Sequence, residues 1–375
     1  MDNKIKPIIL DAKKVDVRKI KKLYKPTTII DSYKQQLEDY FLIKNPKYKF
    51  IKDYKDDFEI FLKKFLKNKS LKESGKWVYF PWNKKVIHCL DEKLLCETRT
   101  ARNVYLITKE EQIKFYKSKI GIAGLSVGSH IALTISMMGG AKYMKLADND
   151  VISLSNLNRI RYPLESIGEN KAVYCAKQIY GINPYADLKI YREGITEKNI
   201  DEFLIKPKID ILIEEMDNLY LKIKIRELAK KYKIPVIMAT DHDNNILIDV
   251  ERFDLEPNRP ILYGLLGNLT SENFKNIPPQ YLVKLTSKIA GEKFATPRML
   301  KSLLEVGKTI YSWPQLGNAA TLCGAVAAYL AKEIILKNKE IKSCRVLINI
   351  EKFFGIKYNK EEVKILLKQF SKNDK

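Results

Sequence analysis

The chain has 375 residues, of which 68 are Lys or Arg and 45 are Asp or Glu, so its formal net charge is +23 at pH 7. This length is enough for one large α/β domain plus a smaller element, or for two domains, and the hydrophobic fraction of 45% is ordinary for a protein that buries a core. No segment approaches the roughly 20 apolar residues of a membrane helix, and the N-terminal apolar run is too short for a signal peptide. We therefore expect a cytoplasmic protein that does not enter a membrane.

Cysteine spacing and charge distribution exclude further classes. The five cysteines are scattered and none forms a Cys-x-x-Cys pair, so we predict neither a disulfide framework nor a structural zinc site. The positive charge comes mainly from lysines that alternate with acidic residues along the whole chain, which is typical of a solvated surface. Acidic partners, including RNA, remain open on this evidence.

The first part of the chain, residues 1–98, is predicted to be an α+β accessory region without a chemical motif. Residues 31–46 and 56–74 place apolar side chains three to four positions apart and predict amphipathic helices. WVYFPW (77–82) and KKVIHCL (84–90) predict short strands. Just beyond this region, Thr108 and Glu111 form a capping-box pattern that predicts a helix N-terminus.

From residue 118 onward, predicted strands and helices alternate with short links. The strands are expected at 119–125, 143–148, 187–193, 209–215 and 234–240, and the helices at 127–140, 170–181, 196–204 and 218–233. This alternation predicts an α/β fold with a doubly wound, mostly parallel sheet within a domain of residues 99–350. Further strands are expected at 245–253, 260–266 and 345–353, with an apolar helix at 321–336. Residues 351–375 are predicted to be a basic C-terminal tail or helix.

A glycine-containing turn joins the first of these strands to its helix. Gly124, Ser126 and Gly128 stand where backbone N–H groups can approach a phosphate at a helix N-terminus. Asp148 follows 24 residues after Gly124, at the end of the second strand, which is the expected place of an acid that accepts hydrogen bonds from ribose. These features suit NAD and ATP equally well.

The residues that follow favour a triphosphate. Asn156, Arg159 and Lys171 lie within 23 positions of the ribose acid, and the extra charge of a triphosphate needs fixed cationic donors of this kind. Asp217 ends the apolar strand IDILIEE beside Asn218, where an acid could hold Mg²⁺ together with phosphates. The sequence therefore predicts an ATP and Mg²⁺ site rather than hydride transfer.

The motifs LADNDVISLSNLNR, IGENKA, INP and EEMDN resemble those of the adenylating ThiF, MoeB and MccB family, which includes the ubiquitin-activating enzymes. The resemblance implies that ATP attaches AMP to a carboxylate, usually the C-terminus of a peptide or small ubiquitin-like protein, within a homodimer. It assigns Asp148 to ribose, the set of Asn156, Arg159 and Lys171 to phosphates, and Asp217 to Mg²⁺ and the α-phosphate. Arg102 or Arg99 corresponds to an arginine that family dimers donate across their interface.

Several features depart from the family pattern. Leu125 and Ser126 fill the middle of the glycine loop, and Ile160 replaces a glutamine. Residues 1–98 are similar to the lead segment of bacterial ThiF-like proteins that are sometimes fused to a nitroreductase-like domain. This chain ends before such a domain, so we expect no flavin. No cysteine has a convincing thioester context, with Cys344 the least excluded, so the reaction is expected to end at an acyl adenylate or a directly supplied acceptor.

Three alternative functions remain open on the sequence. One is the tRNA-modifying branch of the same family, the threonylcarbamoyladenosine dehydratases, which the basic charge mildly favours. A second is an NAD(P)-binding oxidoreductase, which shares the glycine turn and the ribose acid. A third is a nucleotide-binding protein without catalytic activity, which the unusual glycine loop permits.

Overall fold

The computed structural model describes residues 5–275 and 279–373. The chain packs into two compact units, Met1–Ile113 with Lys177–Ala186, and Lys114–Ala176 with Asp187–Lys375. These units are defined by packing alone, so the functional boundaries at 98/99 and 350/351 stay predictions. None of the helices in the described ranges combines the length and the apolar character needed to cross a bilayer.

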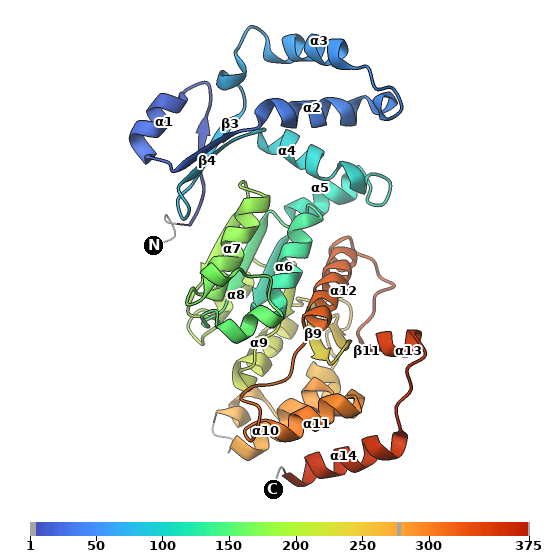
Figure 1. Cartoon of the computed structure of the whole chain (residues 1–375). Coiled ribbons are helices and arrows are strands. Elements are labelled where there is room, and N and C mark those ends of the chain that lie inside the picture. The colour runs from blue at the N-terminus through green and yellow to red at the C-terminus, as the bar shows by residue number, and fades with distance from the viewer. Residues whose placement is uncertain (1–4, 276–278, 374–375) are drawn as a thin grey trace. The chain divides into compact units, whose positions relative to one another are not determined.

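The first unit contains a four-stranded sheet in the order β1 (Ile8–Asp11), β3 (Lys76–Phe80), β4 (Lys85–Cys89) and β2 (Thr28–Asp31). Strand β3 is antiparallel to both neighbours, whereas β2 runs parallel to β4. The helices are α1 (Val17–Tyr24), α2 (Tyr33–Lys44), α3 (Lys55–Leu66) and α4 (Glu92–Arg99) (Figure 1). Both predicted helices and both predicted strands of this region form, although α3 ends at Leu66, and α1, α4, β1 and β2 were not predicted.

Aromatic side chains hold the first unit together. Phe41 on α2 and Phe58 on α3 are buried in one cluster with Tyr48 and Leu62. The predicted capping box is confirmed at α5 (Lys109–Lys117), because the Thr108 N–H donates to Glu111 Oε2 over 2.9 Å and the Glu111 N–H donates to Thr108 Oγ1 over 3.2 Å.

The second unit contains a seven-stranded sheet, in the order β11 (Cys344–Ile348), β10 (Asn245–Glu251), β9 (Val236–His242), β8 (Ile211–Glu214), β5 (Lys119–Ala123), β6 (Tyr143–Ala147) and β7 (Asp187–Tyr191). Neighbours from β9 to β7 are parallel, and only the pairs that involve β10 are antiparallel. The predicted doubly wound, mostly parallel sheet is therefore confirmed. The chain proceeds from β5 outward to β7 and then returns to β8 on the other side, so a topological switch point lies between β5 and β8.

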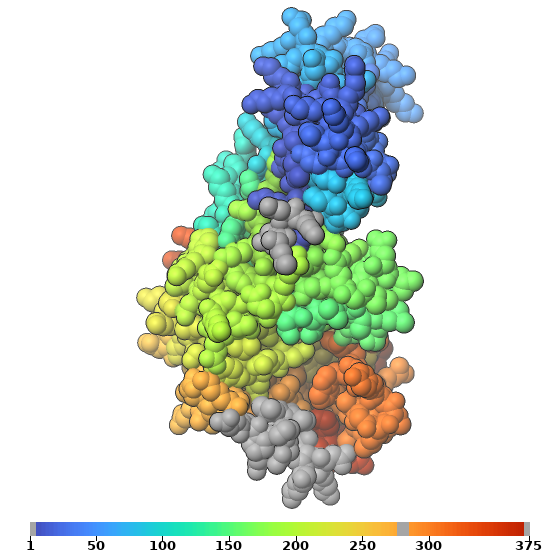
Figure 2. All heavy atoms as spheres, turned by 90° about the vertical axis from the view of Figure 1, so that its left-hand side faces the viewer, coloured from blue at the N-terminus to red at the C-terminus, as the bar shows by residue number. Residues whose placement is uncertain are grey.

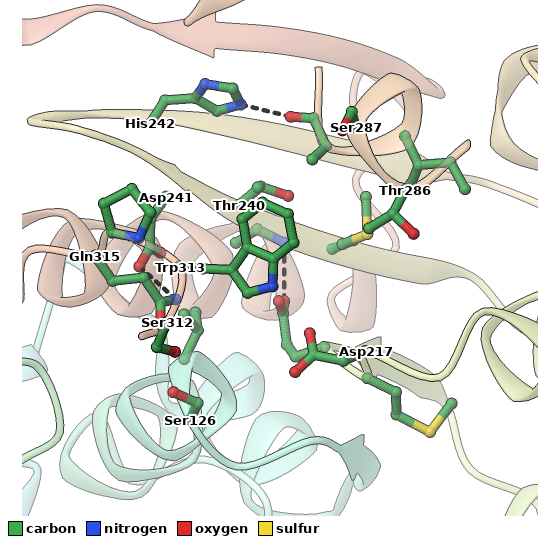
Figure 3. Close-up of a pocket in the computed structure, with 18 of the residues that line it drawn as sticks. Ser126, Asp217, Thr240, Asp241, His242, Thr286, Ser287, Ser312, Trp313 and Gln315 are labelled. Atoms are coloured by element: carbon green, nitrogen blue, oxygen red, sulfur yellow. Dashed lines mark hydrogen bonds between the residues drawn. The ribbon is translucent and has the colours of Figure 1, made fainter. Parts of the chain in front are cut away.

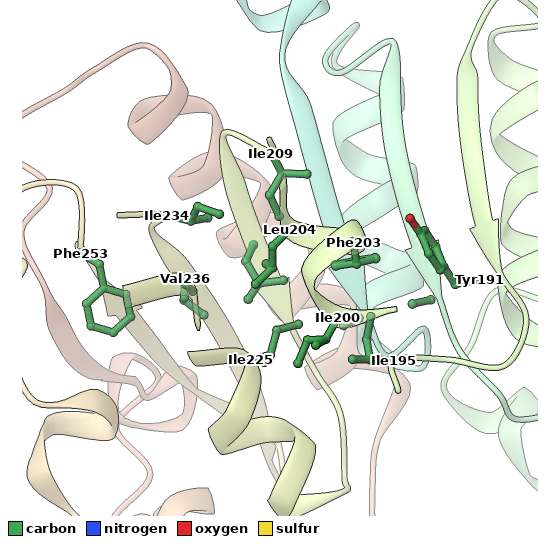
Figure 4. Close-up of a cluster of buried hydrophobic side chains, with 14 residues drawn as sticks. Tyr191, Ile195, Ile200, Phe203, Leu204, Ile209, Ile225, Ile234, Val236 and Phe253 are labelled. Carbon is green, nitrogen blue, oxygen red and sulfur yellow. The ribbon is translucent and has the colours of Figure 1, made fainter. Parts of the chain in front are cut away.

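Helices pack against both faces of this sheet. The core under α8 (Ile200–Ile205) and α9 (Leu219–Lys231) joins Phe203 and Ile225 to strand residues such as Leu212 (Figure 4). In Figure 2 the yellow-green residues around 200–230 form a continuous surface over this part of the unit. Helices α6 (Val127–Met137) and α12 (Gly317–Ile335) pack together on the sheet. Gly324 permits this close approach, since a Cβ there would lie 2.6 Å from the His130 Cβ.

The remaining helices of the second unit include α7 (Lys171–Ile182), which continues into the first unit, α10 (Pro279–Ala290), α11 (Pro297–Glu305), α13 (Ile350–Phe353) and α14 (Lys360–Asn373). Helix α14 packs against α11 through Leu366 and Leu300, so the C-terminal segment forms a helix rather than a tail. The strand predicted at 260–266 is wrong. Residues Ile261–Gly264 form a 3₁₀ turn, because Leu262 and Tyr263 have positive φ angles and the Leu262 N–H donates to buried Glu251 over 2.6 Å.

Candidate active site

A cavity of about 410 Å³ opens at the carboxyl edge of β5, β8 and β9, within the second unit. Its size lies in the range of ligand pockets, which run from roughly 300 to 1,000 Å³. Five of the predicted site residues line it together: Ser126, Asn156, Arg159, Lys171 and Asp217. Figure 3 shows Ser126 and Asp217 toward one end of this cavity and Thr286 and Ser287 toward the other.

The predicted glycines shape the turn rather than line the cavity. Gly124 has a φ of +89°, and a Cβ there would lie 2.4 Å from the Glu215 carbonyl oxygen, so only glycine lets this turn pass so close to the end of β8. A Cβ on Gly128 would contact the Ile122 side chain at 3.0 Å, and glycine thus keeps α6 close to β5. Leu125 and Ser126 fill the middle of this loop, unlike in the family pattern, but the turn still places the N-terminus of α6 at the cavity.

Asp148 is buried and fastens this turn to the end of β6. Its Oδ2 accepts a 2.6 Å hydrogen bond from the Leu125 N–H, and its Oδ1 accepts one of 2.8 Å from the Asp150 N–H. Burial raises the pKa of this carboxyl group, against the opposing effects of Lys171 and the two backbone donors. Asp148 does not line the cavity, so its contact with ribose stays a prediction.

Ser126 is the N-cap residue of α6, and its Oγ is buried without a hydrogen-bond partner among the described residues. A buried hydroxyl without a partner costs free energy, and a ligand oxygen that accepts its hydrogen bond would recover it. The positive end of the helix dipole and the free N–H groups of the first turn lie at the same point. This end of the cavity is therefore suited to a phosphate.

Arg159 brings a guanidinium group that no carboxylate neutralises directly. Its Nη1 donates to the Ser155 carbonyl oxygen at 3.2 Å and to Asn158 Oδ1 at 3.0 Å, while Nε has no partner. It forms no ion pair with any described residue, although Asp241 and Asp217 lie close enough to oppose the lowering of its pKa by burial. An unpaired cation in a half-buried cavity is a ready partner for phosphate oxygens.

Lys171 is also at the cavity but is already paired. Its Nζ lies 2.7 Å from Asp150 Oδ2, and the exposed fractions of the two side chains are 8% and 59%. Both residues line the cavity, and the contact of Lys171 with phosphates stays a prediction. Asp150 is the exposed partner, and a phosphate can compete with it for the ammonium group. Asn156 is buried, and its Oδ1 accepts from the Ser153 N–H over 3.1 Å, which holds the loop that carries Arg159.

Asp217 and Asn218 take different positions after β8. Asp217 is exposed to the cavity and forms no hydrogen bond or ion pair within the described part of the chain. The Asn218 side chain caps α9 by accepting from the Leu221 N–H over 3.0 Å, and it does not line the cavity. Its role at a nucleotide therefore stays a prediction. Arg99 and Arg102 belong to the first unit, and their role across a dimer interface stays a prediction as well.

The sequence reasoning missed part of the lining: Glu215, Thr240, Asp241, Trp313 and Gln315. Asp241 Oδ2 accepts a 3.1 Å hydrogen bond from Gln315 Nε2 (Figure 3), and burial raises the pKa of Asp241 to about 6. Burial likewise raises the pKa of Glu215, whose Oε1 accepts from the Ala239 N–H over 2.8 Å. The signal that identified Asp148 and Asp217, an acid at the end of an apolar strand, also applies to Asp241.

Neither a metal cluster nor an activated thiol accompanies these groups. The residues that the structure describes include no group of three His, Cys, Asp or Glu side chains that could hold a metal ion. No described cysteine lines the cavity, and burial raises the pKa of Cys344 on β11. His242 does line it, but its Nε2 lies 2.5 Å from the Ala290 carbonyl oxygen and burial lowers its pKa.

The chain is similar to Uncharacterized protein MT1398 of Mycobacterium tuberculosis (strain CDC 1551 / Oshkosh), at 35% identity over 75% of this chain and 38% of that protein. It is 33% identical to a probable molybdopterin-synthase adenylyltransferase of Porphyra purpurea, over 32% of each chain. It is 26% identical to the tRNA threonylcarbamoyladenosine dehydratase of Bacillus subtilis (strain 168), over 41% of this chain and 60% of the relative. The chain therefore spans less than two thirds of the length of each of these relatives. Its residues 98–368 match the ThiF family model, and with more than half of its length matched the chain belongs to the ThiF family.

Proposed function

We propose that this chain uses ATP and Mg²⁺ to adenylate a carboxylate, the C-terminus of a peptide or small ubiquitin-like protein, and releases pyrophosphate. The observation that carries this proposal is the convergence of Ser126, Arg159, Lys171 and Asp217 on one cavity at the switch point of the sheet. The similarity to an adenylyltransferase of Porphyra purpurea supports the same reaction class.

The cationic residues at the cavity suit a reaction in which a carboxylate attacks the negatively charged α-phosphate. A C-terminal carboxylate has an ordinary pKa of about 3.5 and is ionised at neutral pH, so it needs no general base. Its attack on the α-phosphorus forms the acyl–phosphate bond, and the bond to the leaving pyrophosphate breaks. Arg159, Lys171 and the α6 N-terminus would neutralise the phosphate charge and hold the reacting groups in line. The lack of an activated histidine or cysteine at the cavity is compatible with such a mechanism.

The described side chains at the cavity could hold Mg²⁺ together with substrate phosphates, but they are too few to hold a metal ion by themselves. Magnesium keeps several waters and is commonly bound by one or two carboxylates together with substrate phosphates. Asp217, which has no protein partner in the described chain, would be that carboxylate. Bound with the triphosphate, the ion would withdraw charge from the phosphate oxygens and ease departure of pyrophosphate. This role for Asp217 is part of the proposal.

The test has two stages. Incubation of the chain with ATP, Mg²⁺ and peptides from a cell lysate should yield an AMP-bearing peptide in the mass spectrum. With that peptide as substrate, Asp217→Asn should lower ATP–pyrophosphate exchange by about 100-fold or more, because it removes the metal carboxylate. Asp201→Asn, at an exposed acid on α8 outside the cavity, is the matched control and should exchange at the wild-type rate. Exchange by Asp217→Asn at that rate would contradict the proposal.

A second candidate is adenylation of a group on tRNA. The net charge of +23 and the similarity to the Bacillus subtilis dehydratase favour it. Binding of tRNA through phosphates should weaken steeply between 50 and 200 mM salt, since each neutralised phosphate releases counterions. Titration of labelled tRNA at low salt decides between the candidates, because absence of binding there removes the tRNA reading.

A further inference from the structure

The cavity has two chemically different halves. One half carries the polar and charged groups that follow β5 and β6, among them Ser126 and Arg159. The other half lies over β9 and is walled by α10, α11 and the segment before α12. Its lining mixes polar side chains, such as Thr240, Thr286 and Ser287, with six apolar or aromatic ones: Ile289, Ala290, Ala295, Met299, Leu303 and Trp313. We call these six residues the apolar wall.

The order of strands assigns the two halves to different reactants. Along the sheet the order is β6, β5, β8 and β9, with Asp148 after β6, Ser126 after β5 and Asp217 after β8. If ribose lies near Asp148 and the phosphates near Ser126, the nucleotide occupies the β6–β5 side. The space over β9 is then left for the carboxylate substrate, which must meet the α-phosphate between the two halves.

Ile289, Ala295 and Met299 also pack in buried clusters, so Leu303 and Trp313 are the members of the wall most available to a ligand. Met299 and Leu303 are four residues apart on α11 and so share one face of that helix. Leu300 and Leu304 lie on the face that packs against α14. The Trp313 side chain, with 49% of its surface exposed, stacks on no other ring among the described residues, and it is drawn near Thr240 in Figure 3. An aromatic side chain left half-exposed at a cavity offers a large contact area to a ligand.

The charged groups on this side disfavour an acidic ligand. Glu292 and Asp241 line the cavity as acids, and Lys222 is occupied by buried Glu214, with its Nζ 3.0 Å from Oε2. His242 directs its Nε2 to a backbone carbonyl oxygen. No unpaired cation is left on this side of the described cavity to meet a second carboxylate, so an acidic side chain is disfavoured here, whereas Leu303 and Trp313 offer apolar contact to an uncharged one.

We propose that the apolar wall binds the side chain of the residue that bears the reactive carboxylate, and that this chain therefore selects substrates ending in an apolar residue such as Leu, Met or Phe. The inference rests on the proposed function for the placement of the nucleotide. Burial of one such side chain in an apolar pocket gives a preference of about 10- to 100-fold over glycine.

The preference can be measured as binding, without chemistry. The probes are N-acetyl-alanyl-leucine, N-acetyl-alanyl-glycine and N-acetyl-alanyl-aspartate, titrated calorimetrically into the full chain saturated with Mg-ADP. We expect the leucine peptide to bind at least about 10-fold more tightly than the glycine peptide, and the aspartate peptide to bind most weakly. Equal affinities, a preference for glycine or aspartate, or no binding of any peptide would overturn the inference.

Two variants test whether the preference for the leucine peptide depends on the apolar wall. Leu303→Gln should reduce the advantage of the leucine peptide to about 3-fold or less while leaving the affinity for ADP unchanged, because Leu303 lies on the far half of the cavity. Arg298→Gln, at an exposed position of the same helix outside the cavity, is the control and should behave as wild type. Retention of the full preference by Leu303→Gln would also overturn the inference. If the peptide preference holds but no carboxylate supports pyrophosphate exchange, the proposed function fails while the apolar subsite stands.

Discussion

Asp241 ends strand β9 with its carboxyl group buried against two partners, Gln315 Nε2 at 3.1 Å and the Cys323 thiol at 3.6 Å. The cost of burying the charge raises its pKa from the ordinary 3.8 to about 6, although Arg159 acts in the opposite direction. The folded chain thus holds the proton more tightly than the unfolded chain. The stability that comes from this group is present below about pH 4 and is lost as the pH rises through 6.

Asp241→Asn is expected to stabilise the chain at neutral pH. Asparagine keeps an oxygen for the Gln315 hydrogen bond and removes the buried charge, so the free energy of unfolding should rise by up to about 3 kcal/mol at pH 8. At pH 4 the gain should fall below about 1 kcal/mol, since the wild-type carboxyl is then protonated in the fold. Urea unfolding at both pH values measures this difference, and Asp201→Asn serves as an exposed control. A gain that does not depend on pH would contradict the account of Asp241.

Asp241 also shows which cavity residues can be predicted from the sequence alone. Asp148, Asp217 and Asp241 each follow an apolar strand, and a rule that places such acids at the carboxyl edge of the sheet finds all three. Trp313 and Gln315 have no such signal, because they lie more than 70 residues beyond β9 in a segment without periodicity. Only folding of that segment over the sheet brings them to the cavity.

The buried Lys145 side chain caps the C-terminal end of α8. It lies on β6 without exposed surface and donates to the carbonyl oxygens of Glu202, Phe203 and Pro207 at 2.8–2.9 Å. These carbonyls lie at the C-terminal end of α8 and just beyond it, where groups without a partner in the helix need donors and where the dipole favours a cation. Burial lowers the pKa of Lys145 to about 8.

Lys145→Met should therefore lower the free energy of unfolding by about 2–4 kcal/mol, because three buried carbonyl oxygens lose their donor. Lys189→Met on neighbouring β7 is the matched control. Lys189 pairs with Glu202 of the same helix, but 42% of its side chain is exposed, so its loss should cost less than about 1 kcal/mol. Chemical denaturation of the two variants compares them directly. A smaller loss for Lys145→Met than for Lys189→Met would rule out this role.

Periodicity predicted the elements of the parallel sheet because each strand is a short apolar run next to an amphipathic helix. Between residues 254 and 316 only a strand at 260–266 was predicted, and that prediction was wrong, while α10 and α11 were missed. The apolar run at 260–266 forms a 3₁₀ turn since a side-chain acceptor, Glu251, binds the Leu262 N–H. Such a tertiary contact is invisible in the local sequence.

At the scale of the whole molecule, family motifs identified residues of the cavity half that we propose for the nucleotide, whereas the other half could be found only in the structure. Each motif is a short continuous segment of the chain, and the motifs follow one another along the sequence between β6 and α9. The strand order, with β8 and β9 beyond β5, depends on how the chain returns across the sheet. This order is what separates the charged half from the apolar wall, and it follows from crossover packing rather than from any one segment.

We propose that Arg159, which forms no ion pair within the described residues, supplies a cation for the phosphates of ATP. The direct measurement is calorimetric titration of Mg-ATP and of NADH into wild type, Arg159→Met and Arg161→Met, the last at an exposed arginine outside the cavity. The account predicts that Arg159→Met weakens ATP binding by about 30- to 100-fold, the loss expected for one charge-assisted contact, while Arg161→Met binds ATP as wild type does and NADH binds to none of the three. Wild-type affinity for ATP in Arg159→Met, or tight binding of NADH in place of ATP, would contradict it.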